Sequence, residues 1–239
     1  MPRLMIPVFL CGLALIAVFT DDIQRLFVGS NVPGQESVSQ SAWTAEPVTV
    51  PRILVGHDED GDGNDDLEDF VIGARAEVER RTVYQDGYYA GGYPPDGVGV
   101  CTDVIWRAFK EAGYDLKDMV DSDIAANIEA YPRVDGNPEP NIDFRRVPNL
   151  TSFFERHADE LTLEVVPGDV ENLSQWQGGD IVVYGKPFPH IGIVSDRRRA
   201  DGVPLLIHNG GPVASEADDL LSWPSPMTHH FRFPESSGN

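Results

Sequence analysis

The stretch DIVVYGKPFPHIGIVSDRRRADGVPLLIHN, residues 180–209, holds three apolar runs separated by short turns. In the runs 180–185, 190–196 and 204–209, side chains follow the two-residue period of a β-strand. The run THHFRF, residues 228–233, repeats this pattern nearer the C-terminus. These runs predict strands joined by short turns, which is the arrangement of an antiparallel sheet.

Helical patterns come before these strands. Apolar residues recur at spacings of three and four over residues 66–82 and again from Cys101 to Ala112, where Gly113 is a suitable stop. Two further helices are predicted, one capped by Asp121 or Ser122 and ending near Tyr131, the other over residues 148–157. Helices followed by antiparallel strands predict an α+β fold with the N-terminal helices packed on the sheet.

The charge and cysteine content exclude several classes of protein. The chain of 239 residues has 18 Lys and Arg against 39 Asp and Glu, a formal net charge of −21. Phosphate backbones repel such a chain, so no nucleic-acid partner is expected. The 2 cysteines, Cys11 and Cys101, are too few for a disulfide scaffold or a cysteine-based zinc site.

The two ends of the chain differ from its centre. An uncharged apolar run over residues 4–19 follows Arg3 and precedes two aspartates, which is typical of an export signal. Residues 1–27 are therefore interpreted as a signal sequence or an N-terminal membrane anchor of an exported protein. Residues 28–57 have the composition of a flexible linker, and residues 235–239 form a tail.

An acidic loop spans residues 58–69. With Asp58 as position one, carboxylates fall at positions one, three, five, nine and twelve, and Gly63 stands at position six, as in an EF-hand-type calcium loop. The candidate calcium ligands are Asp58, Asp60, Asp62, Asp66 and Asp69. Asp65 departs from that pattern at position eight, which is usually aliphatic, and no helical pattern precedes the loop. The alternative is a solvated acidic linker that binds no metal.

Cys101 and two histidines are the candidates for catalysis. Cys101 stands at a predicted helix N-terminus, where the dipole and free N–H groups favour thiolate, so its pKa is expected to lie below about 8.5. His190 opens one predicted strand and His208 ends the next, and adjacent antiparallel strands can bring these ends together. A thiol, a base and a group that orients the base are the catalytic groups of a cysteine hydrolase. The alternatives are a buried cysteine and surface histidines at strand ends.

Five segments carry a resemblance to a known family: GVCTDVIWRAF, NIDFRRVPNLTSFFERH, GGDIVVY, PHIGIVSDRR and LLIHNGG. Together they closely resemble the bacterial family catalogued as domain of unknown function 1287, over about residues 70–234. More distantly, their order is similar to the NlpC-type cell-wall cysteine peptidases of the papain-like superfamily. This resemblance implies a papain-like fold, Cys101 as nucleophile, His190 as general base and His208 as the orienting residue. Asn209 competes with His208, because papain itself uses an asparagine near the same strand end.

Three further residues are candidates for substrate binding. Asp103 follows the cysteine by two residues and either orients a substrate amine or complements the helix dipole. Arg145 either grips a substrate carboxylate or serves as an internal counter-ion. Tyr93 belongs to a Tyr- and Gly-rich loop before the cysteine, and either lines a groove or packs within that loop.

These features together predict a secreted or envelope-anchored cysteine hydrolase that cleaves amide bonds. The resemblance implies that its substrates are peptides of peptidoglycan and that catalysis requires no cofactor. Two alternatives stay open at this point. One is a non-catalytic envelope binding module on the same fold, stabilised by calcium; the other is an acyltransferase that uses the same thiol.

Overall fold

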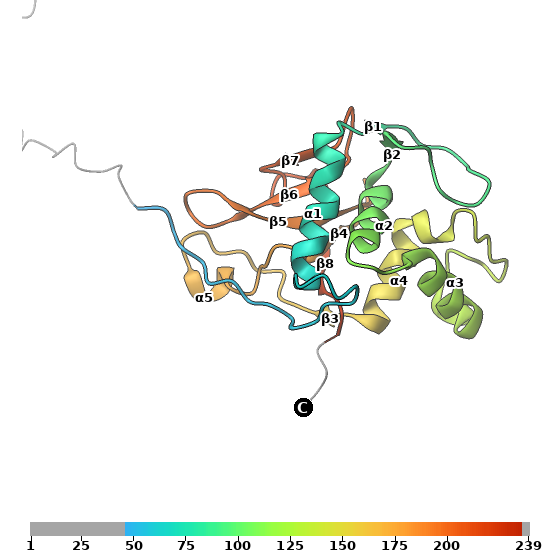
Figure 1. Cartoon of the computed structure of the whole chain (residues 1–239), viewed down its shortest axis with the longest axis horizontal. Helices are drawn as coiled ribbons and strands as arrows, with labels where there is room; N and C mark the ends of the chain where they lie inside the picture. Colours follow the sequence, from blue (N-terminus) through green and yellow to red (C-terminus); the bar gives the residue numbers. More distant parts are fainter. Residues whose placement is uncertain (1–45, 236–239) are drawn as a thin grey trace, which may run out of the picture. The chain divides into compact units, whose positions relative to one another are not determined.

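The computed structural model describes residues 46–235 (Figure 1). The predicted signal or anchor, the linker before residue 46 and the last four residues of the tail lie outside the described residues. Within residues 46–235, no helix is both long enough and apolar enough to cross a membrane. The chain combines helices with an antiparallel sheet, so the α+β prediction is confirmed at that level.

Six strands form the main sheet, in the order β3-β8-β4-β5-β6-β7, with every neighbouring pair antiparallel. The four predicted strands are present as β4 (Ile181–Tyr184), β5 (His190–Arg198), β6 (Pro204–His208) and β8 (Met227–Arg232). The edge strands β3 (Asp159–Glu160) and β7 (Ser215–Ala217) are too short to show a period in the sequence. Two more short strands, β1 (Val83–Tyr84) and β2 (Val98–Gly99), pair in parallel outside this sheet.

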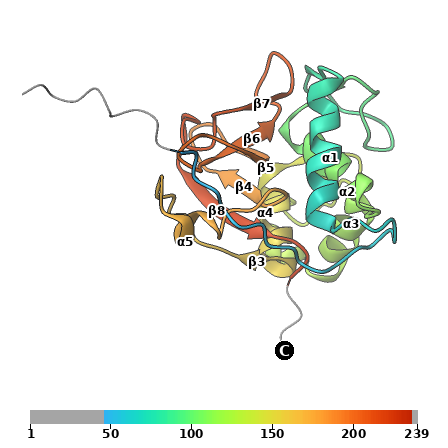
Figure 2. The same cartoon turned by 60° about the vertical axis from the view of Figure 1, so that its left-hand side comes forward.

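The helices are α1 (Asp66–Glu79), α2 (Cys101–Glu111), α3 (Leu116–Ala126), α4 (Val147–His157) and the single turn α5 (Val170–Leu173). Two 3-10 turns, η1 (Ile128–Ala130) and η2 (Asp143–Arg145), lie between α3 and α4. Helices α1 and α2 run side by side along the sheet and both contact β5 (Figures 1 and 2). Within that interface the rings of Phe70 and Phe109 stack with their centroids 4.5 Å apart.

The predicted start of α3 was wrong. Asp115 caps this helix by accepting the backbone N–H of Asp118, so the helix begins before Asp121 and Ser122. Leu116, Val120 and Ile124 lie four residues apart and are buried on one face of the helix. The helix ends at Ala126 rather than near Tyr131, and the Tyr131 hydroxyl donates to Asp123 inside it.

Both faces of the sheet are buried. On one face, Ile181, Val183, Ile191, Ile193 and Ile207 pack with α1, α2 and α4 in the larger core. On the other face, Val182, Val194 and Leu206 pack around Trp176 in a second, smaller core. Strand side chains alternate between faces, so the two cores explain why the strands are apolar at nearly every position.

Residues 46–57 lie along the domain in extended form (Figure 2). The Val48 N–H donates to Ala200 O at 2.9 Å, and the Ile53 N–H donates to Gln177 Oε1 at 3.0 Å. Val48 and Val50 also pack against the smaller core. This part of the predicted flexible linker is therefore bound to the domain through contacts with residues more than 100 positions away, which its own composition does not reveal.

Gly179 generates a prediction about how α1 is held against the sheet. Its φ is +98°, and a Cβ at this position would lie 2.5 Å from the carbonyl oxygen of Leu67 in α1. Gly168 also has a positive φ, +84°, but a Cβ there would meet nothing within 4 Å. We expect Gly168→Ala to cost about 1–2 kcal/mol of unfolding free energy through backbone strain alone. Gly179→Ala should cost a further ~1–3 kcal/mol, because it also pushes α1 away from the sheet.

Urea unfolding of the two variants and the wild-type protein measures this difference. Gly168→Ala is the matched control, since Gly168 shares the positive φ of Gly179 but not its close contact. Equal losses in the two variants would show that the approach of Gly179 to α1 does not contribute to stability.

Candidate active site

Cys101 is the first residue of α2, and its side chain is buried between the start of that helix and β5. Residues Val98–Gly99 pair with β1, and Val100 is extended, so the chain turns into the helix at the cysteine. The thiol lies near the backbone N–H groups of Thr102 and of Ile191, and Ile191 directly follows His190 in β5. Cys101 is only 8% exposed. The fold therefore places the sulfur against the strand that begins with His190.

Asp103 fixes the first turn of α2. One of its oxygens accepts the Val100 N–H at 2.7 Å, and Trp106 Nε1 donates to the other at 2.8 Å. Arg145 completes the set with a bidentate ion pair, at 2.6 Å from Nε and 2.8 Å from Nη2. The two ionic side chains are 1% and 2% exposed. Of the two roles predicted for each residue, this pairing therefore favours the structural one: each side chain is the buried partner of the other.

Arg145 also ties other segments to this helix start. Its Nη1 donates to Gly87 O at 2.8 Å, in the loop between β1 and β2. Its own carbonyl oxygen accepts the Thr102 hydroxyl at 3.0 Å. The segment between α3 and α4 that contains Arg145 thus supports Thr102, the residue next to Cys101.

The two predicted histidines lie together at one end of neighbouring strands. His190 Nε2 is 2.7 Å from His208 Nδ1, and His208 Nε2 is 3.0 Å from Asp219 Oδ2. Both rings are buried, with 3% of His190 and 2% of His208 exposed. The contact between the ends of β5 and β6, which the sequence predicted, is therefore present, and Asp219 extends it by one more residue.

Asn209 lies in a different set of contacts. Its Nδ2 donates to Thr82 O and Gly99 O, each at 3.2 Å, and its Oδ1 accepts the Gly211 N–H at 3.3 Å. These bonds connect the end of β6 with β2, two residues before Cys101. Of the two candidates for the orienting residue, His208 is the one that hydrogen-bonds to His190.

The sequence did not indicate Trp223 and Asp219 as residues of the site. The Trp223 indole stacks on the His190 ring with centroids 3.8 Å apart and planes 15° from parallel, and its Nε1 donates to Phe188 O at 3.1 Å. Both residues lie in the segment between β7 and β8, where no period connects them to the strands. A tryptophan in the Ser- and Pro-rich stretch SWPSP was the one local signal.

Burial governs the electrostatics of the thiol and the imidazole. It raises the pKa of Cys101 to about 11, against the lowering effect of the Ile191 and Thr102 N–H groups. Burial, and then the neighbouring His208, lower the pKa of His190 to about 3. The expectation of a depressed thiol pKa is therefore wrong for this structure, because desolvation outweighs the helix N-terminus. Both groups are neutral at pH 7.

Two tyrosines of the Gly-rich loop lie in different places. Tyr93 packs on Trp106 and Phe144, and its hydroxyl donates to Asp115 at 3.3 Å. It lines a cavity that Cys101, His190 and His208 do not line. Tyr84 is closer to the thiol, since burial and then the charge of Cys101 raise the pKa of its phenol. The tyrosine beside the candidate nucleophile is thus Tyr84, which is 45% exposed.

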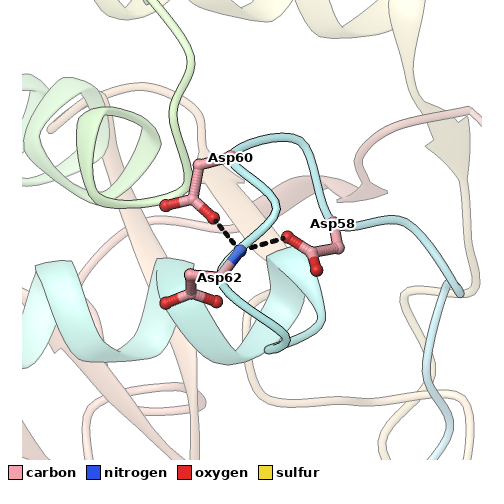
Figure 3. A group of neighbouring side chains, drawn as sticks. All are labelled: Asp58, Asp60 and Asp62. Carbon is pink, nitrogen blue, oxygen red and sulfur yellow. Dashed lines mark hydrogen bonds between the residues drawn. The ribbon is translucent and has the colours of Figure 1, made fainter.

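The acidic loop brings together part of the predicted calcium set. Asp58, Asp60 and Asp62 each offer an oxygen within 4.8 Å of the others (Figure 3). The prediction that Asp66 is a calcium ligand is corrected, because both of its carboxylate oxygens contact other groups of the protein. Oδ1 accepts the Glu59 N–H, whereas Oδ2 contacts His57 Nδ1 and accepts the Tyr114 hydroxyl.

One comparison with known proteins identifies a family. The family model described as "Domain of unknown function (DUF1287)" matches residues 71–233, which include Cys101, His190 and His208. The uncharacterized protein YijF of Escherichia coli (strain K12) is 39% identical over 169 residues, covering 67% of this chain and 78% of YijF. No solved structure matches the chain. Because the family model spans more than half of its residues, the chain belongs to the DUF1287 family.

Proposed function

We propose that this protein is a cysteine hydrolase of amide bonds, with Cys101 as nucleophile, His190 as base and His208 as the residue that orients the base. The observations that carry this proposal are the hydrogen-bonded series Asp219–His208–His190 and a thiol at a helix N-terminus that lies near the N–H of Ile191, the residue after His190. A nucleophile, a base and an orienting group in this order are the requirement of triad catalysis.

The hydrogen bonds assign the ring tautomers. The carboxylate of Asp219 can only accept, so His208 carries a proton on Nε2 and donates it at 3.0 Å. In a neutral ring Nδ1 of His208 is then an acceptor, and His190 Nε2–H donates to it at 2.7 Å. This leaves Nδ1 of His190 with the free lone pair. The series therefore prepares that nitrogen to accept the thiol proton.

The neutral resting pair determines how the reaction begins. As the sulfur attacks the substrate carbonyl carbon, the proton passes from Cys101 Sγ to His190 Nδ1, so the thiolate forms during the attack. His208 and Asp219 stabilise the imidazolium that results. Free N–H groups at the start of α2 are suited to hold the developing oxyanion. The imidazolium then protonates the leaving amine, and water releases the acyl group from sulfur.

The substrate class and location rest on the sequence. The similarity of segment order to the NlpC-type peptidases supports a papain-like arrangement and peptides of peptidoglycan as substrates. The apolar run at residues 4–19 supports export, which would bring the protein to the cell envelope. These catalytic steps use side chains and backbone groups of the chain alone and need no cofactor.

One observation favours a second candidate, an envelope binding module without turnover. The thiol is 8% exposed and burial raises its pKa to about 11, which suits a structural cysteine better than a reactive one. The two candidates differ in turnover, which the first of the following experiments measures. The second experiment measures the ionisation of the thiol.

The first experiment tests the orienting residue. We expect His208→Ala to lower kcat by about 10²–10⁴-fold, as removal of a triad orienter does, because nucleophile and base stay in place but the base loses its tautomer. Purified muropeptides are the substrates, and product masses identify the cleaved bond. Cys101→Ala should abolish turnover.

His229→Ala is the matched control, since His229 belongs to β8 and contacts Thr228 and Glu155 instead of His190. Its kcat should stay near the wild-type value. Asn209→Ala should affect stability more than kcat, because it removes the bonds to Thr82 O and Gly99 O. Turnover that survives Cys101→Ala, or that falls equally in the His208 and His229 variants, would refute the assignment.

The second experiment concerns the thiol. The rate of iodoacetamide alkylation of Cys101 depends on the thiolate fraction, so its midpoint against pH should lie above about 8.5 in the wild-type protein. Trp223→Ala uncovers one face of His190 and should lower the midpoint, because water then reaches both groups. Trp223→Phe keeps an aromatic ring on His190 and is the control. A wild-type midpoint below 8.5 would instead indicate a preformed thiolate–imidazolium pair.

A further inference from the structure

The acidic loop before α1 is independent of the thiol site, and its backbone folds around carboxylates. Asp58 Oδ1 accepts the N–H of Gly61 at 2.7 Å, and Oδ2 accepts that of Gly63 at 3.0 Å. Both glycines have positive φ, +74° and +100°, which allows the chain to turn sharply here. As a result, the carboxylates of Asp58, Asp60 and Asp62 converge on one side of the loop (Figure 3).

A second, independent feature in the first turn of α1 is joined to this cluster through the side chain of Asn64. Asp69 is 2% exposed, and within the described residues its Oδ2 is buried without any hydrogen-bond partner. The Asn64 amide lies between Asp69 and the loop: its Nδ2 donates to Asp69 Oδ1 at 3.3 Å and to Asp62 Oδ2 at 3.0 Å.

Among the described residues, no Lys, Arg or His pairs with these carboxylates. Within residues 46–235, none of the four carboxylates Asp58, Asp60, Asp62 and Asp69 forms an ion pair of 4.0 Å or less with Lys, Arg or His. A buried carboxylate with no cation partner and one unsatisfied oxygen, as in Asp69, is costly, and a bound cation would remove that cost.

We propose that Asp58, Asp60, Asp62 and Asp69 bind one calcium ion. The donors are all carboxylate oxygens on a flexible, glycine-containing loop, which calcium accepts with variable geometry. Magnesium requires nearly ideal octahedral geometry and keeps several waters, so it fits this loop less well. The four ligands stand at positions one, three, five and twelve of the loop, the positions that supply side-chain ligands in an EF-hand.

Positions eight and nine serve a different purpose. Asp65 caps α1 by accepting the Leu67 N–H, and it also accepts the Gly56 N–H at 2.7 Å. Asp66 holds the Glu59 N–H at 2.9 Å and the Tyr114 hydroxyl. These two residues anchor the loop to α1 and to the turn after α2. The departure from the EF-hand pattern at position eight is thus a helix cap, and it leaves the calcium ligands in place.

Calcium at this loop would stabilise the far end of the cysteine helix. Asp60 packs on Gly113, the turn that follows α2, where a Cβ would lie 2.8 Å from Asp60 Cβ. The ion would draw Asp60 and Asp69 together and so join this turn to α1. We therefore expect calcium to raise the stability of the domain.

Calorimetric titration of calcium chloride into the purified full-length protein, freed of metal with EDTA and then desalted, tests the site. We expect one binding site in the wild-type protein and at least tenfold weaker binding in Asp62→Asn and in Asp69→Asn. Glu59→Gln is the matched control, because Glu59 is exposed in the same loop and loses the same charge. Its affinity should stay within about twofold of wild type. Absence of a binding heat in the folded wild-type protein would refute the site.

Thermal unfolding tests whether Asp69 binds calcium or only supports the structure. Calcium should raise the wild-type Tm, and the same concentration of magnesium should raise it less. In EDTA, Asp69→Asn should be at least as stable as wild type, since it removes an unpaired buried charge, but calcium should no longer raise its Tm. An Asp69→Asn protein that is destabilised in EDTA yet binds calcium normally would overturn the role of Asp69. If Glu59→Gln and Asp62→Asn weaken calcium binding equally, the binding comes from general charge attraction and not from this site.

Discussion

The buried ion pair of Asp103 and Arg145 holds the first turn of α2, and the position of Cys101 depends on it. Two parallel hydrogen bonds of 2.6 and 2.8 Å join the side chains, and Asp103 accepts the Val100 N–H in addition. Removing one partner from such a pair leaves an uncompensated charge and typically costs 3–5 kcal/mol. The pair therefore locks the helix start, the 3-10 turn η2 and the loop at Gly87 into one arrangement around the thiol.

The second constraint is the burial of the sheet on both faces. Cores on either side leave little water around the ends of β5 and β6, so His190 and His208 lie in surroundings of low polarity. In such surroundings hydrogen bonds are strong, which favours a defined series from Asp219 to His190. Separated charges are unfavourable in the same surroundings, which explains why thiol and imidazole are both neutral. Burial thus both orients the His190 imidazole and disfavours the thiolate form of Cys101.

Helix α2 is held at each of its ends by acidic residues with different partners. At its start the carboxylate of Asp103 is neutralised by Arg145. At its end the loop of Asp58, Asp60 and Asp62 packs on Gly113, and its charges have no protein counter-ion among the described residues. Because the net charge is −21, the chain has too few cations to pair every carboxylate that the fold brings together.

The strands, the cysteine helix and the acidic loop could be predicted from the sequence, because their signals are local. Short apolar runs between turn residues mark β4, β5, β6 and β8, a period of three to four marks α2, and alternate carboxylates mark the loop. The meeting of His190 with His208 also followed, since the ends of neighbouring antiparallel strands coincide. These local patterns point to Cys101, His190 and His208 as site residues.

Only the tertiary structure decided the contacts between residues that are distant along the chain. Strand parity could not choose between His208 and Asn209, because both faces of β6 are apolar; the contacts of Thr82 and Gly99 with Asn209 made the choice. Asp219 and Trp223 come from an irregular segment, and the pairing of Asp103 with Arg145 spans 42 residues. The thiol pKa depends on burial, which no local pattern measures. Periodicity reports which face a residue occupies, whereas partners and dielectric surroundings arise only when the elements pack.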